Sequence, residues 1–171
     1  EIPRNRKLHP LQLLIRRMEN AYAKPLTSTD DVGPDSSDVI TVTQSNYNTY
    51  FDDEFTAKTS MKQNTTINLV GTFNNVNFIF NKKVHIIGKN CVINQGTIKF
   101  TGDSHASTVT NVTIRNRNPG NINKHGIEIV EVNNCKITNV KIDNYDKYES
   151  FGIFVFSSNG NIITNNEIKN L

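Results

Sequence analysis

The chain has 171 residues, of which 26 are asparagine and none is tryptophan. This length suits a single domain with a sizeable core. The net charge of +3 comes from the first 24 residues, which carry six Arg or Lys side chains against two Glu, whereas the rest of the chain carries 13 basic and 14 acidic side chains. A nearly neutral body offers no basic face to nucleic acid, and no apolar run is long enough for insertion into a membrane.

The N-terminal part differs in pattern from the rest of the chain. Apolar side chains recur there at the spacing of one helix face, at Leu11, Leu14, Ile15, Met18 and Tyr22. Pro10 suits the first position of such a helix, and Pro25 stops it. Residues 27–38 are polar and contain Ser, Asp, Gly and Pro, which is typical of a linker. We therefore predict an amphipathic helix and a linker over residues 1–38 and a second domain over residues 39–171.

The second domain is expected to begin with a strand over residues 39–43 and a short helix. Ser45 is placed to cap the N-terminus of this helix. Four aromatic side chains are expected on its apolar face, namely Tyr47, Tyr50, Phe51 and Phe55. Because open strand edges at the end of a β structure invite aggregation, we expect this aromatic helix to cover the end of the strands that follow.

The C-terminal part contains an internal repeat. Residues 126–145 align without a gap to residues 152–171 at an offset of 26, and eight of the twenty positions are identical. A fixed period of this length is typical of a solenoid. The apolar runs are short, rich in β-branched residues and alternate at period two, which indicates strands rather than helices. We predict an all-β fold, a right-handed single-stranded parallel β-helix of the pectate-lyase-like kind, preceded by the N-terminal helical segments.

The repeat also predicts which side chains stack inside the β-helix. One column of isoleucines is expected at Ile93, Ile114, Ile142 and Ile168, and a second at Ile98, Ile127 and Ile153. The corner sequence Thr-Asn recurs at residues 110–111, 138–139 and 164–165, and Asn tolerates the left-handed conformation that a tight corner needs. The last repeat stops at Leu171 without a cap, so we expect the domain to be truncated at its C-terminal end and the natural chain to continue.

The two cysteines, Cys91 and Cys135, fall in turns of the predicted β-helix that are not adjacent. Neighbouring strands lie about 4.8 Å apart, so the two thiols are about 10 Å apart or more, which is beyond the reach of a disulfide. We predict two free, buried thiols that behave as small apolar side chains.

Two stretches carry a resemblance to a known family. Residues 40–55 (ITVTQSNYNTYFDDEF) and 66–94 (TINLVGTFNNVNFIFNKKVHIIGKNCVIN), followed by repeats of the form T-N-V-x-I-x-N, resemble the opening of the right-handed β-helix domain in adhesin-like surface proteins of methanogenic archaea. The resemblance covers about residues 39–171. It implies an extracellular or cell-wall-associated protein that mediates adhesion, and it supplies no catalytic residues.

An enzyme is the alternative prediction, because β-helices also carry polysaccharide lyases and glycoside hydrolases. Those reactions need paired carboxylates, or acidic oxygens around Ca²⁺ beside a basic proton acceptor. The acidic side chains of the longer loops are Asp103, Asp143, Asp146 and Glu149. Their spacing is more typical of a solvated loop than of a metal site. His105 and His125 have no Cys or His partner at the spacing of a zinc site. We predict no catalytic residue, no metal site and no cofactor.

A binding surface is the favoured functional prediction. Basic and aromatic side chains of two successive loops are expected along one side of the β-helix, at Arg115, Arg117, Lys124, Tyr145 and Tyr148. Arg pairs with the carboxylates of acidic glycans, and aromatic rings stack on sugars. The other interpretation of these residues is ordinary surface decoration. The sequence thus predicts a non-catalytic, adhesin-like cell-surface module that presents loop residues to a glycan or a cell-surface protein.

Overall fold

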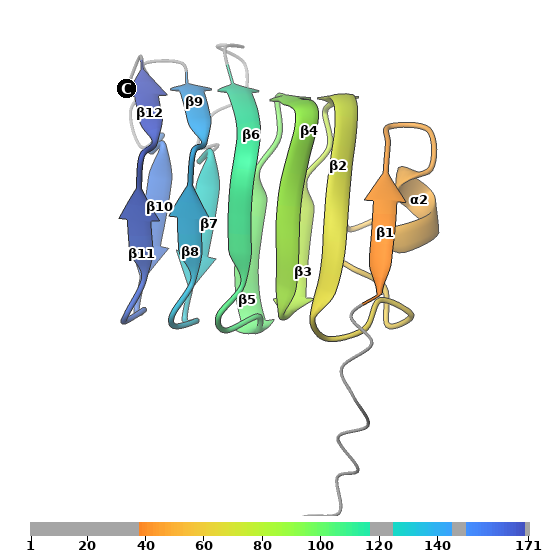
Figure 1. Ribbon diagram of the computed structural model, residues 1–171, viewed down its shortest axis with the longest axis horizontal. Coiled ribbons are helices and arrows are strands. Elements are labelled where there is room, and N and C mark those ends of the chain that lie inside the picture. Colours follow the sequence, from red (N-terminus) through yellow and green to blue (C-terminus); the bar gives the residue numbers. More distant parts are fainter. Residues whose placement is uncertain (1–37, 117–124, 145–149, 170–171) are drawn as a thin grey trace, which may run out of the picture. The chain divides into compact units, whose positions relative to one another are not determined.

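The computed structural model describes residues 38–116, 125–144 and 150–169 (Figure 1). These residues form parallel β-sheets together with one short helix. The prediction of an all-β fold with parallel strands is therefore confirmed. The predicted N-terminal helix and its linker up to residue 37 lie outside the described residues.

The chain passes back and forth between two sheets, and every strand pairs in parallel with its neighbours (Figure 1). In the first sheet the order is β1-β2-β4-β6, and β6 then pairs with both β8 and β9, which pair in turn with β11 and β12. Its strands are β1 (Val39–Val42), β2 (Thr65–Asn74), β4 (Val84–Asn94), β6 (Thr108–Asn116), β8 (Lys136–Thr138), β9 (Lys141–Asn144), β11 (Ile162–Thr164) and β12 (Glu167–Lys169).

The second sheet supplies the opposite layer. Its order is β3-β5-β7-β10, and its strands are β3 (Phe78–Lys82), β5 (Ile98–Asp103), β7 (Ile127–Val130) and β10 (Ile153–Phe156). Successive side chains of a strand point to opposite faces of the sheet. In β7, for example, Ile127 and Ile129 are buried, whereas Glu128 and Val130 are half-buried on the outer face. Each strand therefore contributes one inward row and one outward row of side chains.

The strand register confirms both predicted columns of isoleucines. In the first sheet the successive partners are Ile93, Ile114, Ile142 and Ile168. In the second sheet they are Ile98, Ile127 and Ile153. Each column is extended by one phenylalanine toward the N-terminal end of the sheets, by Phe73 in the first sheet and by Phe78 in the second.

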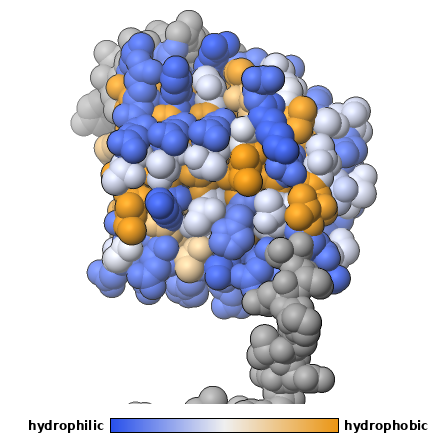
Figure 2. Space-filling model, viewed as in Figure 1, coloured by the Kyte–Doolittle hydropathy of each residue, from blue (hydrophilic) through white to orange (hydrophobic). Residues whose placement is uncertain are grey.

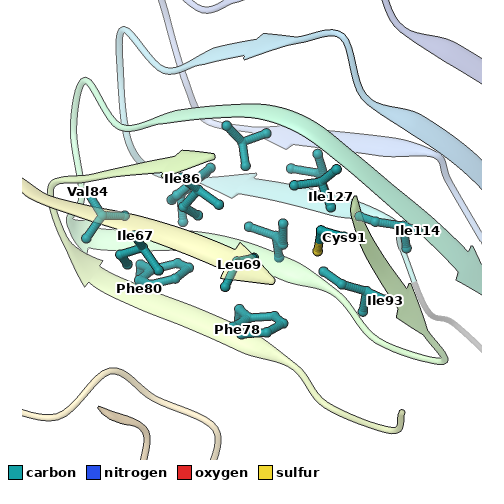
Figure 3. Close-up of a cluster of buried hydrophobic side chains, with 14 of the residues drawn as sticks. Ile67, Leu69, Phe78, Phe80, Val84, Ile86, Cys91, Ile93, Ile114 and Ile127 are labelled. Atoms are coloured by element: carbon teal, nitrogen blue, oxygen red, sulfur yellow. The ribbon is translucent and has the colours of Figure 1, made fainter. Parts of the chain in front are cut away.

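The core lies between the two sheets, where inward side chains from both layers meet (Figure 3). Its largest side chains, which include Phe78, Phe80, Ile67 and Leu69, have no exposed surface. Fully burying one such side chain contributes about 1.5–3 kcal/mol to folding. The many buried apolar side chains can therefore hold the sheets together without a metal ion or a disulfide.

The Thr-Asn corners take the conformation that the sequence predicts. Asn111, Asn139 and Asn165 have backbone φ angles of 58°, 55° and 56°, in the left-handed region that Asn tolerates better than most residues. The preceding threonines, Thr110, Thr138 and Thr164, lie opposite one another in the register. Three other asparagines bond through their side chains to the backbone of a distant part of the chain. The Oδ1 atoms of Asn116, Asn161 and Asn166 each accept a backbone N–H, from Gly96, Cys135 and Val140, at 2.9 Å.

The aromatic helix is shorter than predicted, and its predicted cap is wrong. Helix α2 spans Tyr47–Tyr50, and Asn46 rather than Ser45 occupies the N-cap position. The Asn46 Oδ1 atom accepts the N–H of Thr43 at 2.7 Å instead of an N–H of the helix, and the hydroxyl of Ser45 bonds to that of Thr43. The side chains of Ser45 and Asn46 therefore bond to Thr43, in the turn before the helix, and are not available to cap the helix.

The aromatic side chains predicted to cover the N-terminal end of the core are nevertheless in place. The rings of Tyr47 and Phe51 stack with their centroids 4.6 Å apart, and both side chains are buried. Both also make edge-to-face contacts with Phe78. Burial, together with the charge of Asp52, raises the pKa of the Tyr47 phenol well above its usual range. The aromatic side chains thus seal the apolar interior beside β3 with rings rather than with a long helix.

The two cysteines are free and buried, as predicted. Burial raises the pKa of the Cys91 thiol to about 12 and also raises that of Cys135. Because the thiolate is the reactive form, both thiols are chemically quiet at neutral pH. They act as small apolar side chains of the core.

His85 on the outer row of β4 gives the fold a pH dependence. Its Nδ1 atom lies 3.1 Å from the hydroxyl of Thr108 on the neighbouring strand. Partial burial, aided by the charge of Lys83, lowers the imidazole pKa below its usual 6.5. The unfolded chain therefore binds a proton at a higher pH than the folded chain does. As the pH falls through 6.5 toward the folded pKa, this histidine progressively destabilises the fold, and below the folded pKa the loss is complete.

We expect the variant His85→Gln to remove that part of the pH dependence. Glutamine keeps a group that can bond to Thr108 but does not titrate. Urea unfolding of both proteins at about pH 7.5 and about pH 5 measures the effect, since the remaining histidines contribute equally to both. Wild type should lose more stability on acidification than the variant. If both proteins lost the same free energy of unfolding, His85 would not contribute to the pH dependence.

Candidate binding surface

The outer face of the first sheet carries a cluster of charged side chains at β6, β9 and β12. In-register parallel strands place their outward residues in straight rows across the sheet, about 4.8 Å apart. One row consists of Thr113, Lys141 and Glu167, and the next of Arg115, Asp143 and Lys169. We call these six residues the charged panel. Figure 2 views this sheet from outside. It shows mostly hydrophilic side chains at the upper left, where β9 and β12 lie.

The charged panel surrounds a shallow hollow of about 200 Å³. Three of its side chains are cationic, at Arg115, Lys141 and Lys169, and two are carboxylates, at Asp143 and Glu167. The hollow therefore has a small excess of positive charge. A ligand with carboxylate groups is favoured there over a cationic one.

Glu167 is held between two lysines. Its carboxylate lies 2.6 Å from the ammonium of Lys169 and 3.8 Å from that of Lys141. The hydrogen bond from Lys169, with the charges of both lysines, lowers the carboxyl pKa below its usual range. The Glu167 side chain is exposed, and exposed ion pairs contribute little to stability.

Arg115 is the predicted ligand-binding residue whose position the structure describes. It is exposed and lies within β6, near the end of the strand, rather than in the predicted loop. Its backbone carbonyl accepts the N–H of Gln95 at 2.9 Å, which anchors this strand end. Within residues 38–116, 125–144 and 150–169, its guanidinium makes no ion pair. The other four predicted residues, Arg117, Lys124, Tyr145 and Tyr148, lie outside the described residues.

The carboxylates that an enzyme would need do not form one described cluster. Asp143 lies on β9 in the first sheet, opposite Arg115 on one side and Lys169 on the other. Asp103 ends β5 in the second sheet, opposite Lys82. Asp146 and Glu149 lie outside the described residues. Among the residues that are described, no three His, Cys, Asp or Glu side chains come close enough to hold a metal ion.

Both loop histidines bond to the backbone of the next repeat. The Nδ1 atom of His105 accepts the N–H of Asn133 at 2.9 Å, and that of His125 accepts the N–H of Phe151 at 3.1 Å. A neutral imidazole that accepts at Nδ1 carries its proton at Nε2. The proton on His125 is therefore placed on the ring nitrogen that does not bond to Phe151.

A row of aromatic rings on and beside β10 was not predicted from the sequence. It consists of His125, Phe151, Phe154 and Phe156, which we call the aromatic strip. The ring of Phe154 lies 4.8 Å from that of His125 and 6.3 Å from that of Phe156, measured between centroids. A signal was present in the repeat, because Phe154 and Phe156 replace Glu128 and Val130 of the preceding copy.

The described residues thus define an all-β protein with two parallel sheets, a charged outer face on one and an aromatic outer face on the other. No helix in the described part of the chain has the length and apolarity required to cross a membrane. Comparisons of the chain with protein-family models, with curated proteins and with solved structures find no match.

Proposed function

We propose that this chain is a β-helix module of an extracellular, adhesin-like surface protein, and that its outer faces bind a glycan or a protein partner without catalysis. The repeated passage of the chain between two parallel sheets supports the β-helix assignment. So does the continuous stacking of equivalent residues, such as Ile114 on Ile142 and Ile127 on Ile153. The resemblance of residues 39–171 to archaeal adhesin-like domains supports the proposed location.

The charged panel is the observation that carries the binding proposal. Its Arg115 guanidinium is exposed beside a hollow with three cations and two carboxylates. Arg presents a planar fork of donors that matches a carboxylate. We propose an acidic polysaccharide as its ligand, with Arg115 as the main contact. Arg117 and Tyr145 follow the panel strands closely in the sequence and, with Lys124 and Tyr148, remain predicted contacts.

An enzymatic role has less support from the described residues. Asp103 and Asp143 belong to different sheets, and the Asp143 row alternates acid with base. A polysaccharide lyase or glycoside hydrolase needs its catalytic groups to converge on one bond. Non-catalytic binding requires only that outward side chains be held in a fixed array, which the strand register provides.

Binding of polygalacturonate, an acidic polysaccharide, tests this proposal. We expect Arg115→Ala to weaken binding about tenfold, since a hydrogen bond to a charged group contributes about 1.5 kcal/mol or more. Lys136→Ala is the matched control, because Lys136 is an exposed cation on β8 of the same sheet but outside the charged panel. Isothermal titration of the three proteins gives the affinities. An unchanged affinity in Arg115→Ala would contradict the proposed site, and cleavage of the polysaccharide would replace the binding proposal with an enzymatic one.

A further inference from the structure

The exposed apolar side chains of the last repeat are of two kinds. Val155, Ile163 and Ile168 are 38–42% exposed. Their partners on the preceding strands are fully or almost fully buried, so these three positions face inward. Phe156 is different. It is 51% exposed and lies opposite the half-buried Val130 of the outer row. Its ring therefore faces outward, and adding a strand beyond β10 would extend the core without explaining this ring.

The rings of the aromatic strip form one continuous and ordered group. Phe154 is nearly parallel to both of its neighbours, with interplanar angles of 16° to His125 and 4° to Phe156. Phe151, which is 49% exposed, lies 5.3 Å from His125 and 5.8 Å from Phe154 between centroids. The hydrogen bond from the Phe151 N–H to the His125 ring fixes the imidazole in this group. The strip is thus preorganised, which lowers the entropic cost of binding.

The size of the aromatic strip suits a small ligand better than a protein. An aromatic side chain has roughly 200 Å² of surface to bury, and two of the four rings are about half exposed while the other two are largely covered. The strip therefore offers roughly 300 Å². A stable protein interface buries about 800 Å² on each partner. One or two sugar rings are of the right size for the strip.

Polar groups border the rings on the side of the neighbouring strand. Glu128 lies directly opposite Phe154 in the register, and its carboxylate pairs with the ammonium of Lys99 at 3.2 Å. In the neutral state, His125 offers its Nε2 proton. Rings that stack on apolar C–H groups, next to a carboxylate and an N–H that bond to hydroxyls, form the combination that a pyranose requires.

We propose that the aromatic strip is a binding site for neutral pyranose sugars, in which Phe154 and Phe156 contact the C–H groups of the ring while Glu128 and His125 pair with its hydroxyls. This inference rests on the proposed binding function but assigns a second site, on the opposite sheet from the charged panel, and a different class of glycan. The module would then contact both neutral and acidic sugars through separate faces.

Titration with cellohexaose, chitohexaose and xylohexaose, which are neutral β-linked oligosaccharides, tests the proposal. We expect at least one of them to bind wild type, with saturation-transfer NMR showing the strongest effect at ring C–H protons. Removing one stacked ring should weaken binding several-fold to about tenfold, and the double variant Phe154→Ala/Phe156→Ala should weaken it further. Phe154→Leu/Phe156→Leu is the matched variant, because it keeps apolar side chains but removes the rings, and it should also lose most of the affinity.

Three results would overturn the inference. These are no binding of any of the three oligosaccharides to wild type, unchanged affinity in the double alanine variant, and full affinity in the double leucine variant. Thermal unfolding of each variant establishes that it is folded. Sedimentation velocity tests whether the strip instead binds a second copy of the protein. A wild-type dimer that is absent in the double alanine variant would make the strip a protein interface. Polygalacturonate binding by the same variants separates the two sites, because it should persist when the strip is removed.

Discussion

Replacing Phe78 with alanine is expected to lower the free energy of unfolding by about 3–5 kcal/mol, the range for large-to-small changes of a buried phenylalanine. The Phe78 ring has no exposed surface. It makes edge-to-face contacts with Tyr47, Phe51 and Phe73 at centroid distances of 5.1–5.4 Å. The cavity would open where the aromatic cover meets β2 and β3. Urea unfolding, monitored by circular dichroism, measures the loss of stability.

Phe156→Ala is the control for this prediction, because it makes the same chemical change at a ring that is 51% exposed. It should cost less than about 1 kcal/mol, as is usual for surface positions. The comparison also bears on the aromatic strip, since a small cost would show that Phe156 is not needed for folding. Similar losses in the two variants would contradict the assignment of Phe78 to the core and Phe156 to the outer face.

Gly88→Ala is expected to cost about 3 kcal/mol, at the upper end of the usual range for overpacked sites. Gly88 lies within β4, opposite Leu69. A Cβ atom at this position would lie 2.1 Å from the backbone oxygen of Asn111 and 2.7 Å from its carbonyl carbon. Backbone atoms of a neighbouring corner cannot move aside as the end of a flexible side chain can. The strand or the corner would have to shift.

Gly71→Ala separates this clash from the effect of glycine itself. Gly71 has a φ angle of +85°, but no atom lies within 4 Å of where its Cβ would be. Alanine there should cost about 1 kcal/mol from the left-handed backbone alone. Thermal and urea unfolding of both variants give the comparison. A Gly71→Ala variant less stable than Gly88→Ala would contradict the contact with Asn111 as the main constraint.

The core was predictable from sequence because two independent patterns agree on it. Alternation at period two assigns each residue to a face, and the offset of 26 between copies assigns its partner. The offset of 26 identifies Ile168 as the neighbour of Ile142. The Thr-Asn corners at 110–111 and 138–139 identify Ile114 as its other neighbour, and the register confirms both. The cap of α2 was not predictable in this way. Ser45 and Asn46 are both good capping residues, and local hydrogen bonds to Thr43 decide what each side chain does.

The candidate site was predictable only in part. Arg115 could be assigned to the surface from its charge and its place after a strand, but the charged panel depends on which residues of β9 and β12 lie beside it. Comparing the copies pairs Asp143 with Lys169, and the predicted column from Ile114 to Ile142 pairs Arg115 with Asp143, but neither pairing tells which outward side chains enclose a hollow. The aromatic strip was missed for another reason. Its rings come from positions where the copies differ, and such positions carry no periodic signal.

The separation of inward from outward rows has a consequence for how this surface can change over time. A substitution at an outward position, such as glutamate at 128 against phenylalanine at 154, alters what a ligand meets while the stacked interior stays intact. Binding specificity can therefore diversify one row at a time at little cost to folding. A single-residue insertion within a strand has the opposite effect, because it turns every following side chain of that strand to the other face. Point substitutions and gains of whole repeats are thus the routes by which such a protein can acquire new ligands.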